Sequence, residues 1–228
     1  RSRPSRRARP RTKLDPKVGQ HQAELYADCL QTMTGQRPVI YYTNGYDTWI
    51  WDGCFYTPRE AQGFHTKDEL QLMLNRRKSR KDITKAQVNR DIVDRYYHEE
   101  ATRRIMEAFC NKSRAALVVM ATGSGKTRLA ISAVEILMKN NWVRRALFLA
   151  DRTALLRQAK NAFNKCYPQA SLVNLVEEKE NDDARVVFST YPTMMNLIDD
   201  ARQDGPNRFG VGHFDLVIID EAHRSVYQ

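Results

Sequence analysis

The sequence predicts an α/β protein in which a parallel β-sheet, flanked by helices, follows a smaller α/β unit. Three observations support this fold class. Short apolar runs alternate with amphipathic helical patterns from residue 115 onward, a glycine-rich turn joins the first run to a helix, and the last run ends in two adjacent carboxylates. Near-continuous Val, Ile and Leu runs are typical of strands that are covered on both faces. We therefore expect a parallel sheet sandwiched between helices.

Composition limits the class of protein. The chain has 228 residues, of which 42% are hydrophobic and 28% are charged, as in a globular protein with one full domain and part of a second. No apolar run approaches the roughly 18 residues that a membrane span needs, so no membrane partner is expected. The four cysteines are too widely spaced for a close metal-ligand pair, and a reducing, cytoplasmic location is the default expectation. Because the chain begins with Arg1 and ends soon after a strong motif, we expect a fragment.

Positive charge is concentrated at the start of the chain. Residues 1–13 carry seven positive charges and no negative charge, in a chain whose net charge is +10. With two prolines and almost no apolar side chain, this segment cannot bury enough surface to offset its chain entropy, so we expect a disordered basic tail. Two interpretations stay open: a tail that binds nucleic-acid phosphates, or a solvated end without function.

The elements before residue 112 follow from local patterns. Apolar residues at helical spacing predict an amphipathic helix over residues 22–30. Two β-branched and aromatic runs around Asn44-Gly45 predict a β-hairpin over residues 38–51. Residues 66–80 are predicted to form a polar helix, and residues 94–111 a second helix. We place a charged linker at residues 76–93, between these two regions.

The second half alternates strands and helices. Strands are predicted at residues 115–120, 145–150, 172–176, 185–189 and 214–219. Helices are predicted at residues 126–139, 153–165 and 192–201. This order predicts parallel strands joined by helical crossovers.

A glycine-rich turn, ATGSGKT, lies between the first predicted strand and its helix. Gly123 and Gly125 allow backbone N–H groups to turn inward, the Lys126 ammonium can reach terminal phosphates, and the Thr127 hydroxyl can bind Mg²⁺. The first position of the strict phosphate-loop pattern holds Met120 instead of glycine, but the strand–turn–helix context is retained. The alternative is a turn that only joins two elements. The candidate residues for binding ATP here are Thr122, Gly123, Ser124, Gly125, Lys126 and Thr127.

Two carboxylates, Asp220 and Glu221, follow the last predicted strand. Ligands of a parallel α/β sheet bind beyond the carboxyl ends of its strands, so these carboxylates are expected to face the glycine-rich turn. Asp220 can hold Mg²⁺, and Glu221 can orient or deprotonate the attacking water in phosphoryl transfer. Taken alone, an acidic strand end can also be a solvated turn. Lys126 and Glu221 are the candidate catalytic residues, and His223 would couple the nucleotide state to other motifs.

ATGSGKT and the DEAH run at residues 220–223 resemble motifs I and II of superfamily-2 helicases. Four longer stretches resemble the motor (R) subunit of type I restriction enzymes: LVVMATGSGKTRLAI, LFLADRTALLRQA, VVFSTYPTMM and FDLVIIDEAHRSVY. Two stretches upstream, GQHQAELYADCL and RPVIYYTNGYDTWIWD, resemble the end of the nuclease domain of that subunit. The resemblance covers residues 12–228. It implies the C-terminal part of a nuclease-like domain at residues 14–75 and a RecA-like helicase ATP-binding domain at residues 94–228.

The resemblance also implies roles for single residues. Arg152, Thr153 and Gln158 match motif Ia, which contacts the DNA backbone in related motors, although Thr153 could instead be a helix N-cap. Ser189 and Thr190 match a further DNA-contact motif. His98 occupies the position of a glutamine in the adenine-recognising segment of the family. Gln22 and Tyr26 match a Q-x-x-x-Y element of the nuclease, and their i, i+4 spacing places both on one helix face. There they could contact DNA or support the catalytic carboxylates, although an isolated pair of this kind is usually only surface and core of a helix.

The activity implied for the whole enzyme is ATP-dependent translocation of double-stranded DNA followed by cleavage, in complex with methylation (M) and specificity (S) subunits. The resemblance implies an Asp and a Glu-x-Lys before Gln22 for cleavage, whereas residues 1–11 contain no acid; the second RecA-like domain with its arginine finger would lie beyond Gln228. We therefore expect this chain to bind ATP and Mg²⁺ but neither to cleave DNA nor to hydrolyse ATP rapidly. Two alternatives stay open: another superfamily-2 helicase or repair translocase, and a nucleotide-switched binding module without motor activity.

Overall fold

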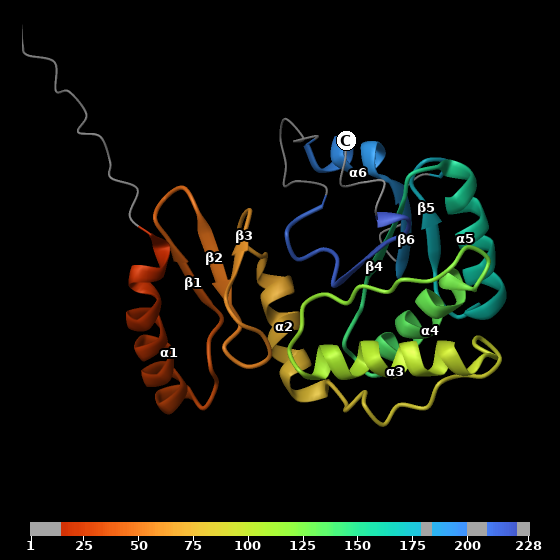
Figure 1. Ribbon diagram of the computed structural model, residues 1–228. Helices are drawn as coiled ribbons and strands as arrows, with labels where there is room; N and C mark the ends of the chain where they lie inside the picture. Colours follow the sequence, from red (N-terminus) through yellow and green to blue (C-terminus); the bar gives the residue numbers. More distant parts are fainter. Residues whose placement is uncertain (1–14, 179–183, 200–208, 223–228) are drawn as a thin grey trace, which may run out of the picture. The chain divides into compact units, whose positions relative to one another are not determined.

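A computed structural model describes residues 15–178, 184–199 and 209–222 of the chain (Figure 1). The expected basic tail at residues 1–13 lies outside this range, as does His223. The chain divides into two compact units between Gly63 and Phe64. None of the helices among the described residues has the length and apolar character needed to cross a membrane.

The first unit packs one helix against a small antiparallel sheet. Its strand order is β1-β2-β3, with Ala27 of the helix buried against Ile40 and Tyr42 of β1. The expected helix and hairpin are confirmed, whereas the 3₁₀ turn and β3 were not predicted. Gly45, with φ +89°, and the Asn44 side chain form the hairpin loop. The elements are η1 (Pro16–Gly19), α1 (Gln20–Thr34), β1 (Ile40–Thr43), β2 (Thr48–Trp51) and β3 (Arg59–Ala61).

The second unit is built on a four-stranded parallel sheet with the order β5-β6-β4-β7. Its helices are α2 (Lys67–Ser79), α3 (Tyr96–Cys110), α4 (Lys126–Lys139), α5 (Thr153–Cys166) and α6 (Tyr191–Asp199). Its strands are β4 (Ala146–Ala150), β5 (Leu172–Asn174), β6 (Val186–Thr190) and β7 (Leu216–Ile219). The parallel sheet flanked by helices confirms the predicted fold class of this region.

Helices and loops cover both faces of this sheet, as the apolar runs predicted. On β4, Phe148 packs into the core cluster formed with α3, α4 and α5, whereas the neighbouring Leu147 and Leu149 pack into a second cluster on the other face. β6 alternates in the same way, with Phe188 on the first face and Val187 on the second. The parallel register aligns the carboxyl ends of β4, β6 and β7 at one edge, where Leu149 pairs with Ile219.

The strand predicted at residues 115–120 is not formed. These residues have no regular secondary structure, and the Leu117 and Val119 side chains are 85% and 88% exposed. The sequence prediction rested on the β-branched and apolar composition of this run, but a strand also requires a partner for its backbone N–H and C=O groups. Within the described sheet, β7 is an edge strand that pairs with β4 alone, and residues 115–120 add no further ladder.

The boundary between the two units differs from the expected one. We expected a linker at residues 76–93, but α2 already belongs to the second unit. Arg76 of α2 donates two hydrogen bonds, of 2.5 and 2.6 Å, to the Asp215 carboxylate just before β7. Asp215 also accepts the backbone N–H groups of Arg144 and Arg145 before β4. This bidentate ion pair ties α2 to the amino-terminal ends of β4 and β7.

The Arg76–Asp215 pair gives a stability prediction. Its side chains are 10% and 13% exposed, so Arg76→Met leaves a desolvated carboxylate without its cation and is expected to reduce the free energy of unfolding by about 3–5 kcal/mol. The matched control is Arg90→Met, because the Arg90 side chain, which pairs with Glu99, is 83% exposed and its loss should cost less than about 1 kcal/mol. Urea unfolding of both variants measures the difference. Equal losses would contradict a structural role for the pair.

Candidate functional site

The glycine-rich turn at residues 121–125 forms a loop that leads directly into α4. Gly123 and Gly125 have φ values of +76° and +95°, in the left-handed region that favours glycine. Gly125 is the N-cap of α4, and its carbonyl accepts the N–H of Leu129. The loop is closed by Ser124, whose hydroxyl donates to the Ala121 carbonyl over 2.6 Å. The free N–H groups of the first helical turn make this helix end suited to an anion.

Lys126 and Glu221 meet at this helix end. The Lys126 Nζ lies 3.1 Å from the Glu221 Oε1, although the two residues are 95 positions apart in the sequence. Their side chains are 34% and 26% exposed, so both remain accessible to a ligand. The glycine-rich turn and the acidic strand end therefore face one another, which is the arrangement that the parallel sheet predicted.

Asp220 continues β7 at the same edge. Its N–H donates to the Leu149 carbonyl of β4 over 2.9 Å, and its carboxylate accepts the backbone N–H of Glu221. Half-burial raises the pKa of the Asp220 carboxyl; the Glu221 N–H opposes this shift, and the negative charges of Glu221 and Asp151 add to it. Asp151, directly after β4, was missed by the sequence reasoning. The available signal was its position after a buried strand, the same signal that pointed to Asp220.

The donor set at this edge can be compared with the needs of Mg²⁺. Among the described residues, no group of three or more His, Cys, Asp and Glu side chains is arranged to hold a metal ion. Mg²⁺, however, keeps several waters and is bound by one or two carboxylates together with substrate phosphates. A half-buried Asp220 carboxylate next to the phosphate-loop candidates fits that mode, with the Thr127 hydroxyl on the first turn of α4 as a second donor.

The amino-terminal end of α3 contacts the glycine-rich turn. His98 is buried, and its Nε2 lies 2.7 Å from the Ser124 carbonyl oxygen. The adjacent Tyr97 donates its hydroxyl to the same carbonyl over 3.1 Å. His98 was expected at the nucleotide site from the resemblance alone, whereas Tyr97 was missed, because nothing in a Tyr-Tyr-His run distinguishes the tyrosine that contacts the loop.

The candidate DNA contacts of the second unit follow β4 and β6. Arg152 and Gln158 of the α5 region are exposed, and Arg152 lies 3.6 Å from the Asp151 carboxylate. Thr153 is the first residue of α5, and the N-cap is Arg152, so Thr153 is not the N-cap considered above. Thr190 accepts the N–H of Thr193 and so caps α6, and the preceding Ser189 is buried.

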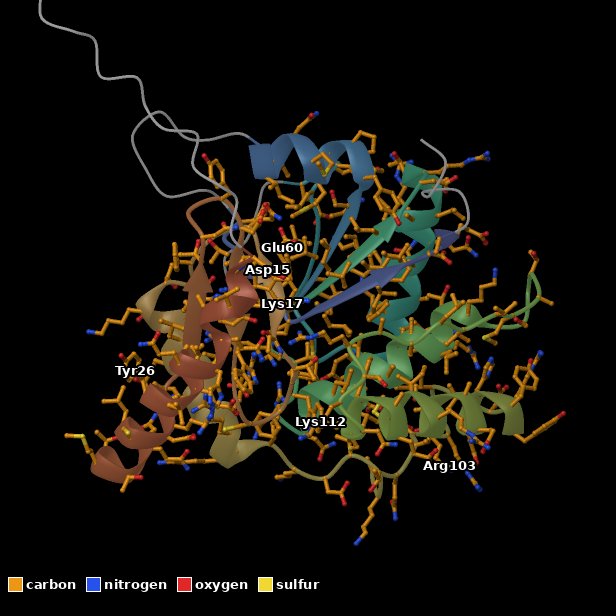
Figure 2. All side chains as sticks on the ribbon, turned by 60° about the vertical axis from the view of Figure 1, so that its left-hand side comes forward. Asp15, Lys17, Tyr26, Glu60, Arg103 and Lys112 are labelled. Atoms are coloured by element: carbon orange, nitrogen blue, oxygen red, sulfur yellow. The ribbon has the colours of Figure 1, made fainter. Side chains whose placement is uncertain are left out.

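Gln22 and Tyr26 belong to the first unit and are both exposed on α1. Figure 2 labels Tyr26 on this helix. The Gln22 Nε2 donates to the Tyr26 hydroxyl over 2.8 Å. The i, i+4 spacing therefore brings the two side chains into contact, as the sequence predicted.

A separate cavity of about 510 Å³ lies between residues 83–88 and α3, with Tyr96, Thr102, Arg103 and Met106 in its lining. Neither Lys126 nor the carboxylates at residues 220 and 221 line it. The candidate nucleotide site is thus an open helix end and strand edge, distinct from this cavity.

Comparison with known proteins identifies the family. Residues 91–228 match the family model described as "Type III restriction enzyme, res subunit". The EcoKI endonuclease subunit of the type I restriction enzyme of Escherichia coli strain K12 is 31% identical over 137 residues, which are 57% of this chain and 11% of that protein. The EcoAI endonuclease subunit of the Escherichia coli type I enzyme is 35% identical over 131 residues, which are 57% of this chain and 16% of that protein.

A solved fragment of a putative HsdR subunit of a type I restriction enzyme from Vibrio vulnificus YJ016 is 26% identical, with a TM-score of 0.43; the match covers 92% of this chain and 37% of that one. The chain spans less than a fifth of the EcoKI and EcoAI subunits. The resemblance to type I endonuclease subunits, which the sequence motifs predicted, is confirmed. The chain belongs to the restriction-enzyme family described as "Type III restriction enzyme, res subunit" and is similar within it to the endonuclease (R) subunits of type I enzymes.

Proposed function

We propose that this chain is the ATP-binding and DNA-contacting part of an ATP-dependent DNA translocase, the R subunit of a type I restriction enzyme. The observation that carries the proposal is the 3.1 Å contact between the Lys126 ammonium and the Glu221 carboxylate. This contact supports the proposal, because it brings together a candidate phosphate-binding cation and a candidate general base at the carboxyl ends of the strands. The matches to type I endonuclease subunits support the DNA substrate and the M and S subunits as partners.

The proposed chemistry begins with exchange of the Lys126 ion pair. In the structure, the Glu221 carboxylate forms an ion pair with the Lys126 ammonium. Nucleotide phosphates that reach the amino-terminal end of α4 would compete with this carboxylate for Lys126, because both are anions. The released Glu221 then orients the attacking water and accepts its proton. A magnesium ion held by Asp220 and Thr127 would offset the phosphate charge.

The proposed DNA contacts lie at the same sheet edge. Arg152, Thr153 and Gln158 at the start of α5, and Thr190 after β6, follow the carboxyl ends of strands that neighbour the nucleotide site. The first unit, with Gln22 and Tyr26 exposed on α1, is assigned to the end of a nuclease domain. This assignment rests on the sequence motifs and on the contact between those two side chains.

Lys126→Ala tests the phosphate site. Removing the ammonium is expected to raise the Kd for ATP by at least about 30-fold, because a charged hydrogen-bonding partner of the phosphates is lost. Affinity for duplex DNA should stay unchanged. Isothermal titration calorimetry measures ATP binding, with Lys165→Ala, an exposed lysine at the end of α5, as the matched control. Unchanged ATP affinity in Lys126→Ala would remove the phosphate-loop assignment.

Glu221→Gln separates binding from turnover. The amide no longer holds Lys126 as an ion pair, so ATP is expected to bind several-fold more tightly. The slow single-turnover phosphate release that we expect from the wild type should fall by about a further 100-fold, because the base is lost. The exposed Glu60→Gln is the control. Weaker ATP binding in Glu221→Gln than in the wild type would contradict competition between the carboxylate and the phosphates.

Arg152→Ala tests the DNA contact at α5. The plot of log Kd for duplex DNA against log salt concentration should become shallower by about 0.9 if one phosphate contact is lost. Arg157→Ala is the matched control on the same helix, because Arg157 is already paired with Glu177. Fluorescence anisotropy at several salt concentrations gives both slopes. An equal change in the two variants would show that Arg152 has no special role.

A further inference from the structure

Two side chains of α3 bind the same backbone atom of the glycine-rich turn. The carbonyl of Ser124 accepts a hydrogen bond from the Tyr97 hydroxyl over 3.1 Å and lies 2.7 Å from the His98 Nε2. A carbonyl oxygen can only accept, so the Nε2 must carry the proton. Arg95 donates to the Tyr97 hydroxyl oxygen over 2.6 Å, which leaves the hydroxyl proton free to point at Ser124. Tyr97 and His98 therefore converge on one carbonyl, and Arg95 supports the Tyr97 hydroxyl.

The His98 ring also fits against the backbone of the turn. A Cβ atom added to Gly125 would lie 2.7 Å from both the Cε1 and the Nε2 of His98, closer than real Cβ contacts allow. Two features of the structure thus require a glycine at position 125: its positive φ and the close approach of the His98 ring. The Tyr97 ring packs edge-on against the His98 ring, with ring centroids 4.6 Å apart.

His98 has no nitrogen available to a nucleotide base in this arrangement. The residue is 1% exposed, and its Nε2 is engaged with Ser124. Its Nδ1 is buried as well and has no hydrogen-bond partner among the described residues. A base could reach Nδ1 only by displacing the packing around α3. The position that the family resemblance assigns to adenine recognition is therefore occupied by a side chain that contacts the loop.

We propose that His98 and Tyr97 are positioning residues that hold the phosphate loop in shape, so that nucleotide recognition through this segment depends on the triphosphate and not on the base. The inference rests on the proposed ATP-binding function and deepens it, because it names the ligand class as nucleoside triphosphates without base selection. Loss of the Ser124 contact lets the loop move, and the N–H groups of this loop would bind the phosphates. The resulting loss of binding free energy is therefore the same for every base.

The binding experiment compares wild type, His98→Ala, His98→Gln and Tyr97→Phe with three probes, ATP, GTP and inorganic tripolyphosphate, each with Mg²⁺. The wild type should bind ATP and GTP within about threefold of each other. His98→Ala should weaken all three probes by one common factor, about tenfold. His98→Gln should recover most of this loss, because its amide N–H can donate to Ser124, and Tyr97→Phe should show a smaller loss with the same pattern. His21→Ala, an exposed histidine of α1, is the matched control.

A second measurement needs no nucleotide. Hydrogen exchange of the amides at residues 121–125 should be about tenfold faster in His98→Ala than in the wild type, while exchange in the core of β4 stays the same, which also shows that the variant is folded. Unchanged exchange in the loop overturns the positioning role. A second outcome also overturns the positioning role. In it, the wild type prefers ATP over GTP by tenfold or more, and His98→Ala loses this preference while its binding of tripolyphosphate is unaffected. Failure of the wild type to bind any probe instead removes the proposed ATP-binding function, and the exchange result then decides the positioning role alone.

Discussion

The contact between Lys126 and Glu221 depends on the parallel pairing of β4 with β7. The pairing places Leu149 opposite Ile219, so β7 ends beside the carboxyl end of β4. Directly after this strand, Glu221 adopts a φ of +52°, which is uncommon for a residue with a side chain and turns the chain sharply. The turn lets the Glu221 N–H donate to the Asp220 carboxylate. The two adjacent carboxylates thereby differ: the Asp220 carboxylate accepts a backbone N–H, whereas the Glu221 carboxylate contacts the Lys126 ammonium.

Hydrogen bonds also fix the amino-terminal end of β7. Asp215 receives two hydrogen bonds from Arg76 and the backbone N–H groups of two residues that precede β4. A strand of only four residues, Leu216–Ile219, separates this anchor from Asp220. Because β7 is an edge strand of the described sheet, its position depends on β4 along one side and on Arg76 at its start. The α2 helix therefore contributes to the placement of the candidate site even though none of its residues was predicted to take part.

Elements that depend on local sequence patterns were predicted correctly, whereas elements that depend on strand pairing or on packing in space were not. Helix α4 was predicted over its full length, because both of its ends carry local signals, a glycine before Lys126 and polar residues after Lys139. Residues 115–120 were wrongly predicted as a strand, because composition does not reveal whether a backbone partner exists. Strand β3 was missed, because its sequence, Arg-Glu-Ala, has no β-branched or aromatic residue. Its place in the sheet comes from pairing with β2.

The same distinction applies to the site. The glycines, Lys126 and the carboxylate pair were predicted because phosphate binding needs those residue types in one order along the chain. The contact of His98 with Ser124 could not be predicted, since it depends on where the first turn of α3 packs in space. Asp151 was missed for a related reason: one carboxylate after a strand is informative only when the neighbouring strand is known to carry another.

Charge along α5 restricts where this helix can meet a polyanion. Arg157 and Lys160 are paired with Glu177 and Glu178 in the turn after β5, which neutralises the middle of the helix. Arg152, at the amino-terminal end, lies 3.6 Å from Asp151, a long contact with an exposed arginine that a phosphate could replace. Asp151 is also one of the charges that raise the pKa of Asp220. A change in what Arg152 binds therefore alters the field at the candidate magnesium ligand, so that the proposed DNA and nucleotide sites share one carboxylate between them.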